Sequence, residues 1–323
     1  MILAIDAMGG DNAPIQPVIA AVNWAAASDD RILLVGQREV LAEELKKAGY
    51  TGDQIEIIHA SQVVEMEESP AMVMRRKKDS SIVVATQLVK DGKADAVLSC
   101  GSTGAQMVSS MFILGRMEGV DRSPVIALLP QRKGGQCVLL DVGANVDCKP
   151  EQLLQFALLG QIFADSLLNR SHPVVMLLNN GGEEGKGNAQ AQATYAMLKA
   201  DRRVNFAGNI EGRDIFNGDA DIIVCDGFVG NVMLKTIEGV AGFMMRLCME
   251  EQGTLPRTFA QLDYAQVGGS PLLGINGISM VCHGSSNHET IFNGIRMAKQ
   301  CCNLDLVGRQ RTILAANMDE KKD

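Results

Sequence analysis

Six short apolar runs along the chain each end directly in a tight loop of Gly, Asn, Ser or Asp. These passages are ILAID-AMGGDN (2–12), AVLSC-GSTGA (96–105), CVLLD-VGANVD (137–147), VVMLL-NNGGEEGKGN (174–188), IIVCD-GFVGN (222–231) and SMVCH-GSSN (279–287). Each run has the length and composition of a buried β-strand. In an open α/β sheet the carboxyl ends of parallel strands share one edge, and ligands bind there. Because glycine turns let backbone N–H groups approach an anion, the sequence predicts one composite site for a small anionic group.

Strand-like and helix-like segments alternate along nearly the whole chain, which indicates a three-layer α/β/α sandwich with a largely parallel mixed sheet. Helices are expected at 14–27, 38–48, 70–78 and 80–91, and a long one is expected to begin at an Asn231 cap. Residues 253–271 break this rhythm, so 250–271 is predicted to be a short arm or loop. The chain 1–323 is read as a single catalytic unit, or as two intertwined subdomains whose boundary the sequence does not mark.

Composition excludes several classes of protein. A formal charge of −8 and 4% aromatic residues argue against nucleic-acid binding, which needs basic surfaces and stacking platforms. No apolar stretch approaches the roughly 20 residues that span a bilayer, and the N-terminus shows no secretory signal. Eight cysteines without a CxxC pair do not resemble a disulfide framework. These features predict a cytoplasmic protein.

Neither standard phosphate fingerprint is present, since the chain has no GxxxxGK[ST] and no GxGxxG after a strand. An anion must therefore be held by several separate loops. The candidate phosphate-binding residues, which offer backbone amides, hydroxyls or amide side chains, are Gly9, Gly10, Ser102, Thr103, Gly104, Asn145, Asn188 and Gly230. Alternatively, Gly9, Gly104 and Gly230 serve only to permit positive φ in tight turns.

Seven motifs in this order resemble those of bacterial phosphate acyltransferases of the PlsX type. They are DAMGGD (6–11), GSTGA (101–105), LLDVGANVD (139–147), KGN (186–188), CDGFVGN (225–231), LKT-EG (234–239) and HGSS (283–286). The resemblance covers nearly the whole chain. It implies a fold like that of isocitrate and isopropylmalate dehydrogenases, and transfer of a fatty acyl group from acyl carrier protein to inorganic phosphate. It also implies a homodimer without metal or organic cofactor, whose acyl-phosphate product feeds an acyl-phosphate-dependent glycerol-3-phosphate acyltransferase.

Three side chains are the catalytic candidates: Lys186, Asn231 and His283. The Lys186 ammonium lies in a glycine-flanked loop and would neutralise phosphate or the developing oxyanion. His283 would protonate the departing thiolate or bind the carrier's prosthetic arm, and a purely structural histidine is the alternative. A covalent acyl-cysteine on Cys100, Cys225 or Cys282 is not expected, because buried cysteines commonly serve as small core residues.

The densest basic run is predicted to dock the acidic carrier protein; it comprises Arg75, Arg76, Lys77 and Lys78. The same charges would also complement the carbonyl end of their own helix. The chain departs from typical relatives in having Ser102 in place of Asn, Val281 in place of Lys, and a shorter 250–271 segment. That short segment has few apolar side chains, which argues against association with the membrane surface.

Three rival functions remain open at the level of sequence. The first is a phosphotransacetylase that acts on a short acyl-coenzyme A. In the second, Asp6, Asp141 and Asp226 hold Mg²⁺ for an oxidative decarboxylation. Alternatively, these carboxylates only cap helices or accept hydrogen bonds from loop amides. The third is a non-catalytic protein that binds acyl carrier protein.

Overall fold

The computed structural model describes residues 1–65, 68–254 and 268–319. The chain divides into two compact units. Unit 1 consists of Met1–Met117 and the described part of 264–307, and unit 2 consists of the described parts of 118–263 and 308–323. Helix α10 (Leu306–Asp319) begins in unit 1 and continues in unit 2. The composition does not change where the chain passes from one unit to the other, which is why the sequence shows no boundary.

Unit 1 is built on a sheet with the strand order β10-β11-β4-β1-β2-β3. Its strands are β1 (Ile2–Asp6), β2 (Arg31–Gly36), β3 (Ile55–His59), β4 (Ala96–Ser99), β10 (Ser270–Pro271) and β11 (Ile278–Val281). All neighbours pair in parallel except β10 and β11. Ile5 lies opposite Leu34 on one side and Leu98 on the other, and all three are fully or almost fully buried. Continuous apolar runs of this kind are expected where helices cover both faces of a parallel sheet.

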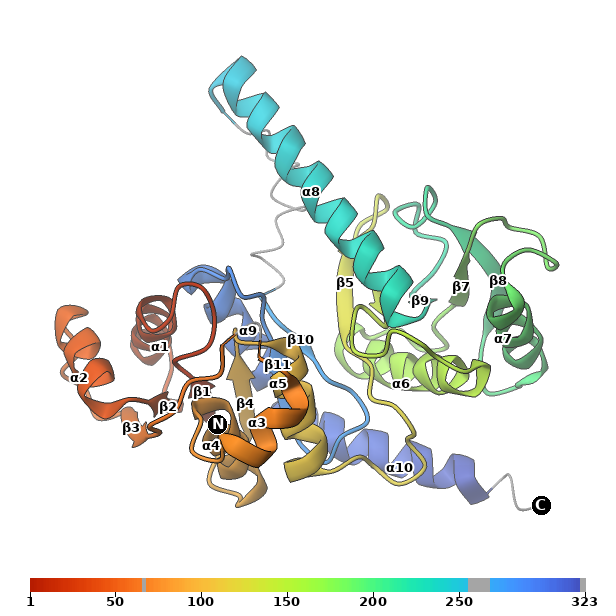
Figure 1. Cartoon of the computed structure of the whole chain (residues 1–323). Helices are drawn as coiled ribbons and strands as arrows, with labels where there is room; N and C mark the ends of the chain where they lie inside the picture. The colour runs from red at the N-terminus through yellow and green to blue at the C-terminus, as the bar shows by residue number, and fades with distance from the viewer. Residues whose placement is uncertain (66–67, 255–267, 320–323) are drawn as a thin grey trace. The chain divides into compact units, whose positions relative to one another are not determined.

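The helices of unit 1 follow the predicted pattern, as the ribbon in Figure 1 shows. They are α1 (Ile15–Ala27), α2 (Arg38–Lys47), α3 (Pro70–Arg76), α4 (Ser81–Lys90), α5 (Thr103–Ser109) with its π-helical continuation η1 (Ser110–Leu114), and α9 (His288–Asn303). Pro70 occupies the first helical position of α3, where its missing N–H costs nothing. The helices predicted at 14–27, 38–48, 70–78 and 80–91 are confirmed to within one or two residues at each end.

Unit 2 contains a second sheet, with the strand order β5-β6-β9-β7-β8. Its strands are β5 (Ile126–Pro130), β6 (Gln136–Leu140), β7 (Val175–Asn179), β8 (Phe206–Glu211) and β9 (Ile222–Val224). β5 and β6 form an antiparallel hairpin, and the other pairs are parallel. Helix α6 (Pro150–Leu168) supplies the fully buried Phe156 and Phe163, and α7 (Ala189–Ala200) follows β7. The predicted α/β class is confirmed, with the largely parallel strands divided between two sheets.

Helix α8 (Gly227–Gln252) leaves the end of β9, and in Figure 1 its far half extends beyond the other elements of unit 2. The predicted long helix is confirmed, but its predicted cap is wrong. Asp226 is the N-cap residue, and its Oδ1 accepts a hydrogen bond from Val229 N at 2.8 Å. Asn231 therefore lies inside the first turns. The helix starts earlier because Asp226 is the first residue after β9 whose side chain can reach these amides.

All six predicted strands are present, and each loop named in the sequence follows the carboxyl end of its strand. Loops after β1, β4 and β11 belong to unit 1, whereas loops after β6, β7 and β9 belong to unit 2. Within the described residues, no helix combines the length and the hydrophobicity needed to cross a bilayer. The predicted arm at 250–271 falls largely on 255–267, which lie outside the described residues.

Candidate active site

The three loops of unit 1 contact one another. The amide of Asp11 donates to the carbonyl oxygen of Gly284 at 2.8 Å, which ties the β1 loop to the β11 loop. A Cβ on Gly9 would lie 2.9 Å from the backbone of Gly101, so only glycine lets the β1 and β4 loops approach this closely. Gly10 has φ of +102°, a conformation that side chains other than glycine rarely adopt. The proximity expected for these three loops is therefore present within unit 1.

The carboxylate of Asp6 lies beneath these loops and is 3% exposed. It accepts hydrogen bonds from Ser99 Oγ at 2.7 Å and from Met8 N at 3.3 Å, while Ser99 Oγ in turn accepts from Gly101 N at 3.0 Å. Burial raises the pKa of Asp6, and these hydrogen bonds partly offset the shift. Asp6 thus helps to hold the loops after β1 and β4 in place.

The predicted residues Ser102, Thr103 and Gly104 begin helix α5. Ser102 is its N-cap, and its Oγ accepts from Ala105 N at 3.4 Å. A Cβ on Gly104 would lie 2.6 Å from Cγ of Pro70, so this glycine admits the start of α3. None of Gly9, Gly104 and Gly230 has φ in the left-handed region, so the alternative that they serve to permit positive φ is wrong. Close approach of neighbouring atoms accounts for each of them.

His283 lies exposed in the loop after β11. Its Nδ1 accepts from Ser285 N at 3.3 Å and lies 2.8 Å from Ser285 Oγ. An amide that donates to Nδ1 places the proton of the neutral imidazole on Nε2. The ring is therefore oriented as a donor through Nε2, which suits contact with an oxygen that gains negative charge.

In unit 2 the loop after β6 is organised around the carboxylate of Asp141, which is fully buried. Its Oδ1 accepts from Val125 N and Ala144 N, and its Oδ2 accepts from the backbone and side-chain nitrogens of Asn145, all at 2.6–3.1 Å. Burial raises the pKa of Asp141, and the four donors oppose that shift. Asn145 Nδ2 also donates to Ser123 O at 3.0 Å, so this predicted phosphate ligand directs its amide nitrogen into the loop itself.

The loop after β9 packs on the loop after β6. Gly227 N donates to Asn145 O at 2.8 Å, and a Cβ on Gly143 would lie 3.5 Å from the side chain of Asn231. The candidate Asn231 therefore faces the 141–147 loop. A Cβ on Gly230 would lie 1.9 Å from the carbonyl oxygen of Asp141, so no larger residue fits without moving backbone.

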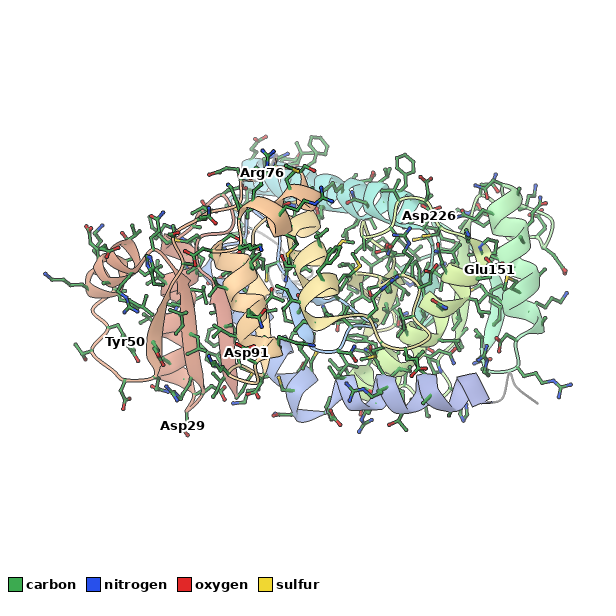
Figure 2. The ribbon with its side chains drawn as sticks, turned by 60° about the horizontal axis from the view of Figure 1, so that its bottom comes forward. Asp29, Tyr50, Arg76, Asp91, Glu151 and Asp226 are labelled. Carbon is green, nitrogen blue, oxygen red and sulfur yellow. The ribbon has the colours of Figure 1, made fainter. Side chains whose placement is uncertain are left out.

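A cavity of about 420 Å³ lies within unit 2 at the carboxyl ends of β7 and β9. Its polar lining comes from Asn179, Asn180, Asn188, Gln190 and Asp226, and its apolar lining from Leu153, Leu177, Leu178, Val229 and Met233. Asn188 caps α7 and Asp226 caps α8, so the N-termini of two helices border one cavity. The positive dipole end of α7, whose cap is the neutral Asn188, favours a bound anion, whereas the N-terminus of α8 already has the carboxylate of Asp226. Figure 2 labels Asp226 at the start of α8 and Glu151 near the start of α6.

Lys186 lies in the loop between β7 and α7, and its side chain is 51% exposed. Its Nζ is 4.0 Å from Glu183 Oε2, and its carbonyl oxygen accepts from Asn179 Nδ2 at 3.2 Å. An exposed pair at this distance contributes little stability, so the ammonium can move to a bound anion at little cost. Asn179 and Asn180 were not among the predicted site residues. Their position between a strand and Gly-Gly is the sequence signal that could have identified them.

The buried thiols are poorly suited to act as nucleophiles. Burial raises the pKa of Cys225 far above its ordinary value, and Asp141 and Asp226 raise it further. The pKa of Cys100 is raised by its contact with Cys282 and by burial. A thiol must ionise to attack a carbonyl carbon, so these environments favour the structural role expected for the cysteines.

The basic run at the end of α3 divides into two groups. Lys77 Nζ pairs with Glu68 and donates to Val63 O, so its contacts are with the loop before α3 and not with the carbonyl end of its own helix. Arg75, Arg76 and Lys78 are exposed, and Figure 2 labels Arg76 at the end of α3. Lys77 differs from its three neighbours because Glu68 lies close to it in space. The spacing of these residues along the chain does not reveal that contact.

Asp6 belongs to unit 1, whereas Asp141 and Asp226 belong to unit 2, and each carboxylate accepts from neighbouring amides or hydroxyls. No group of three or more His, Cys, Asp or Glu in the described ranges is arranged as metal ligands. Capping and support of loop amides account for the observed contacts of all three aspartates.

Comparison with solved structures places the fold in a known class. The EutD phosphotransacetylase from Staphylococcus aureus aligns over 93% of this chain and 94% of its own, with a TM-score of 0.61 and 17% identity. A branched-chain phosphotransacylase from Enterococcus faecalis aligns over 94% of this chain and 99% of its own, with a TM-score of 0.61 and 16% identity. At these identities the likeness shows the fold, which is that of the phosphotransacylases.

Sequence comparison identifies the family. A family model described as "Fatty acid synthesis protein" matches residues 1–309. Proteins named phosphate acyltransferase are 54% identical in Syntrophomonas wolfei and 50% identical in Desulfitobacterium hafniense, covering 98% and 93% of this chain and 99% and 94% of theirs. The chain therefore belongs to the phosphate acyltransferase family, the acyltransferases of fatty acid and phospholipid synthesis. The resemblance stated from its motifs is confirmed.

Proposed function

We propose that this acyltransferase moves a fatty acyl group from the thioester of acyl carrier protein to inorganic phosphate. A phosphate oxygen attacks the thioester carbonyl carbon, the carbon–sulfur bond breaks, and the thiolate leaves and takes a proton from solvent. The products are an acyl-phosphate and the free carrier thiol. Phosphate is itself nucleophilic near neutral pH, so the protein need supply only position and charge stabilisation.

The cavity at the starts of α7 and α8 is the observation that carries this proposal. The N-terminus of α7 favours an anion there, and the amides of Asn179 and Asn188 can donate to its oxygens. Lys186, one residue before Gly187 of the lining, can supply the cation. Asp226 can accept the remaining proton of hydrogen phosphate, which leaves the other oxygens to the donors.

We propose roles for the other candidates from their contacts. The glycine turns of unit 1 at Gly9, Gly10 and Gly104, with Ser102 and Thr103, offer amides and hydroxyls to an anionic group. His283 donates from Nε2 to the thioester or to the carrier's prosthetic arm. Asn231 and Gly230 shape the 141–147 loop, whose Asp141 and Asn145 hold each other in place.

The exposed cations of α3 are the proposed contact for acyl carrier protein. Arg75, Arg76 and Lys78 form a local basic patch on a chain of net charge −8, and opposite charge speeds the encounter with an acidic partner. The acyl-phosphate is a reactive mixed anhydride, so we propose that an acyl-phosphate-dependent glycerol-3-phosphate acyltransferase consumes it. We place the enzyme in the cytoplasm, where its eight free cysteines stay reduced.

Release of carrier thiol tests the proposed reaction. Hexadecanoyl carrier protein should release free thiol only when phosphate is added, with one acyl-phosphate formed for each thiol. Acetyl-coenzyme A, the donor suggested by the fold shared with phosphotransacetylases, should react at least tenfold more slowly. Thiol release that ignores phosphate would contradict the proposal, and preference for acetyl-coenzyme A would favour the phosphotransacetylase. Carrier binding without turnover would favour the non-catalytic rival.

We propose further that two copies associate through the far half of α8. Val240, Phe243, Met244 and Met249 are all exposed there, with Phe243 53% exposed. Exposed apolar side chains in this number on one helix are unusual for a monomer, and a second copy of the chain would cover them symmetrically.

Phe243→Glu should therefore convert a dimer into a monomer, because the introduced carboxylate would be buried without a partner. Sedimentation equilibrium measures the mass directly. The exposed Glu250→Gln variant on the same helix should retain the wild-type mass. A monomeric wild type, or a dimer that survives Phe243→Glu, would contradict this assignment.

A further inference from the structure

A second cavity, of about 410 Å³, lies wholly within unit 1 on the outer face of helices α3, α4 and η1. Its wall consists of aliphatic side chains: Met74 from α3, Val83, Val84 and Leu88 from α4, and Ile113 from η1. Val83 and Leu88 belong to the buried core and form the floor, whereas Met74, Val84 and Ile113 are only partly buried. The size lies within the range of small-molecule sites.

The polar side chains that line this cavity are those of Lys78, Gln87 and Asp91, and all three residues are exposed. Gln87 Nε2 donates to Asp91 Oδ1 at 2.7 Å, and Lys93 Nζ lies 3.9 Å from Asp91 Oδ2, so these groups engage one another at the end of α4. Lys78 follows the exposed Arg75 and Arg76. The cavity therefore joins an aliphatic interior to a polar margin with the cation Lys78 and the carboxylate Asp91.

The cavity runs along α4, which extends from the carboxyl ends of the strands, where the glycine loops lie, to their amino ends. Ser81, at the first turn of α4, hydrogen-bonds the carboxylate of Asp6, which supports the glycine loop after β1. Asp91, at the other end of the helix, precedes β4. Figure 2 labels Arg76 and Asp91 at opposite ends of this α3–α4 face. Ten residues of helix give the face a length of about 15 Å.

We propose that this cavity binds the saturated hydrocarbon chain of the acyl donor, with Lys78 and the neighbouring arginines beside its entrance. The inference rests on the proposed function and names the site that would select chain length. An unbranched chain suits the cavity because its wall offers neither an aromatic face nor a buried polar group that would orient a ring or a sugar. Lys78, which lines the cavity close to the exposed Arg75 and Arg76 in the sequence, suits the acidic carrier that delivers the chain. Each methylene moved from water into such a wall improves affinity about fourfold.

Val84→Phe tests the site, because Val84 is partly exposed and a larger side chain there fills the cavity without displacing the floor. We expect kcat/KM for hexadecanoyl carrier protein to fall at least tenfold, while octanoyl and acetyl carrier protein change less than twofold. Val84→Ala should widen the cavity and improve the ratio of hexadecanoyl to octanoyl turnover. Lys90→Ala, on the exposed side of the same helix, should match wild type. An unchanged chain-length profile in both Val84 variants would overturn the inference, as would an equal loss for every donor.

A direct binding measurement separates this inference from the proposed reaction. cis-Parinaric acid, a long-chain fatty acid that fluoresces when it enters an apolar site, should bind wild type at least tenfold more tightly than Val84→Phe. The same ratio in an enzyme that forms no acyl-phosphate would support the chain site while the proposed reaction fails. Equal binding by the two proteins, in an enzyme that forms acyl-phosphate normally, would overturn the chain site while the reaction stands.

Discussion

Lys186→Ala should slow phosphate-dependent release of the carrier thiol by ~10²-fold or more, as expected when a group that stabilises transition-state charge is removed. The Lys186 ammonium makes an exposed contact of 4.0 Å with Glu183, and the residue lies in the loop between β7 and α7, next to Gly187, which lines the cavity at the starts of α7 and α8. Lys186→Arg retains the positive charge and should recover part of the rate. Thiol release should be measured at saturating and at limiting phosphate, so that changes in kcat and KM are separated.

Lys199→Ala is the matched control. Lys199 lies on α7, pairs with Glu184 at 2.8 Å, and is exposed to a similar degree as Lys186. Loss of this surface pair should leave the rate within twofold of wild type. A Lys186→Ala enzyme that works at the wild-type rate would remove the lysine from the reaction and leave anion binding to helix termini and amides alone.

Gly230→Ala should lower the free energy of unfolding by about 3 kcal/mol or more, the upper range for overpacking in a close-packed region. The added Cβ would lie 1.9 Å from the carbonyl oxygen of Asp141 and 2.9 Å from Cys225 Sγ, and neither the backbone nor the buried thiol can move away cheaply. Thermal unfolding should show Tm reduced by on the order of 5–10 °C. Activity should fall as well, because Asp141 organises the 141–147 loop.

Gly239→Ala provides the comparison on the same helix. A Cβ on Gly239 meets no atom within 4 Å, and this position is exposed. Because alanine favours the helix over glycine by roughly 0.8–1.0 kcal/mol, this variant should be as stable as wild type or slightly more stable. Equal stability of the two alanine variants would show that the backbone around Asp141 yields easily, contrary to the packing described above.

The roles of the aspartates and lysines can be distinguished only from the groups that lie next to them in space. Sequence alone allowed Asp226 to be a ligand or a cap, and the amide of Val229 shows that it caps α8. The same uncertainty applied to the run 75–78, where Glu68 takes Lys77 out of the exposed group. Side-chain partners that are nine or more residues away cannot be inferred from spacing, because many geometries bring such residues together.

The sequence by itself determined the α/β class, the six strands with their glycine-rich ends, and the family. These follow from short-range properties: apolar runs specify buried strands, and glycine with small polar residues specifies the turns that leave them. Tertiary structure decided that the strands belong to two sheets, that Gly230 and Gly9 are required for close approach rather than for positive φ, and that a cavity lies along α4. Such features depend on which distant surfaces pack together, and that packing is not encoded in the local pattern of any one segment.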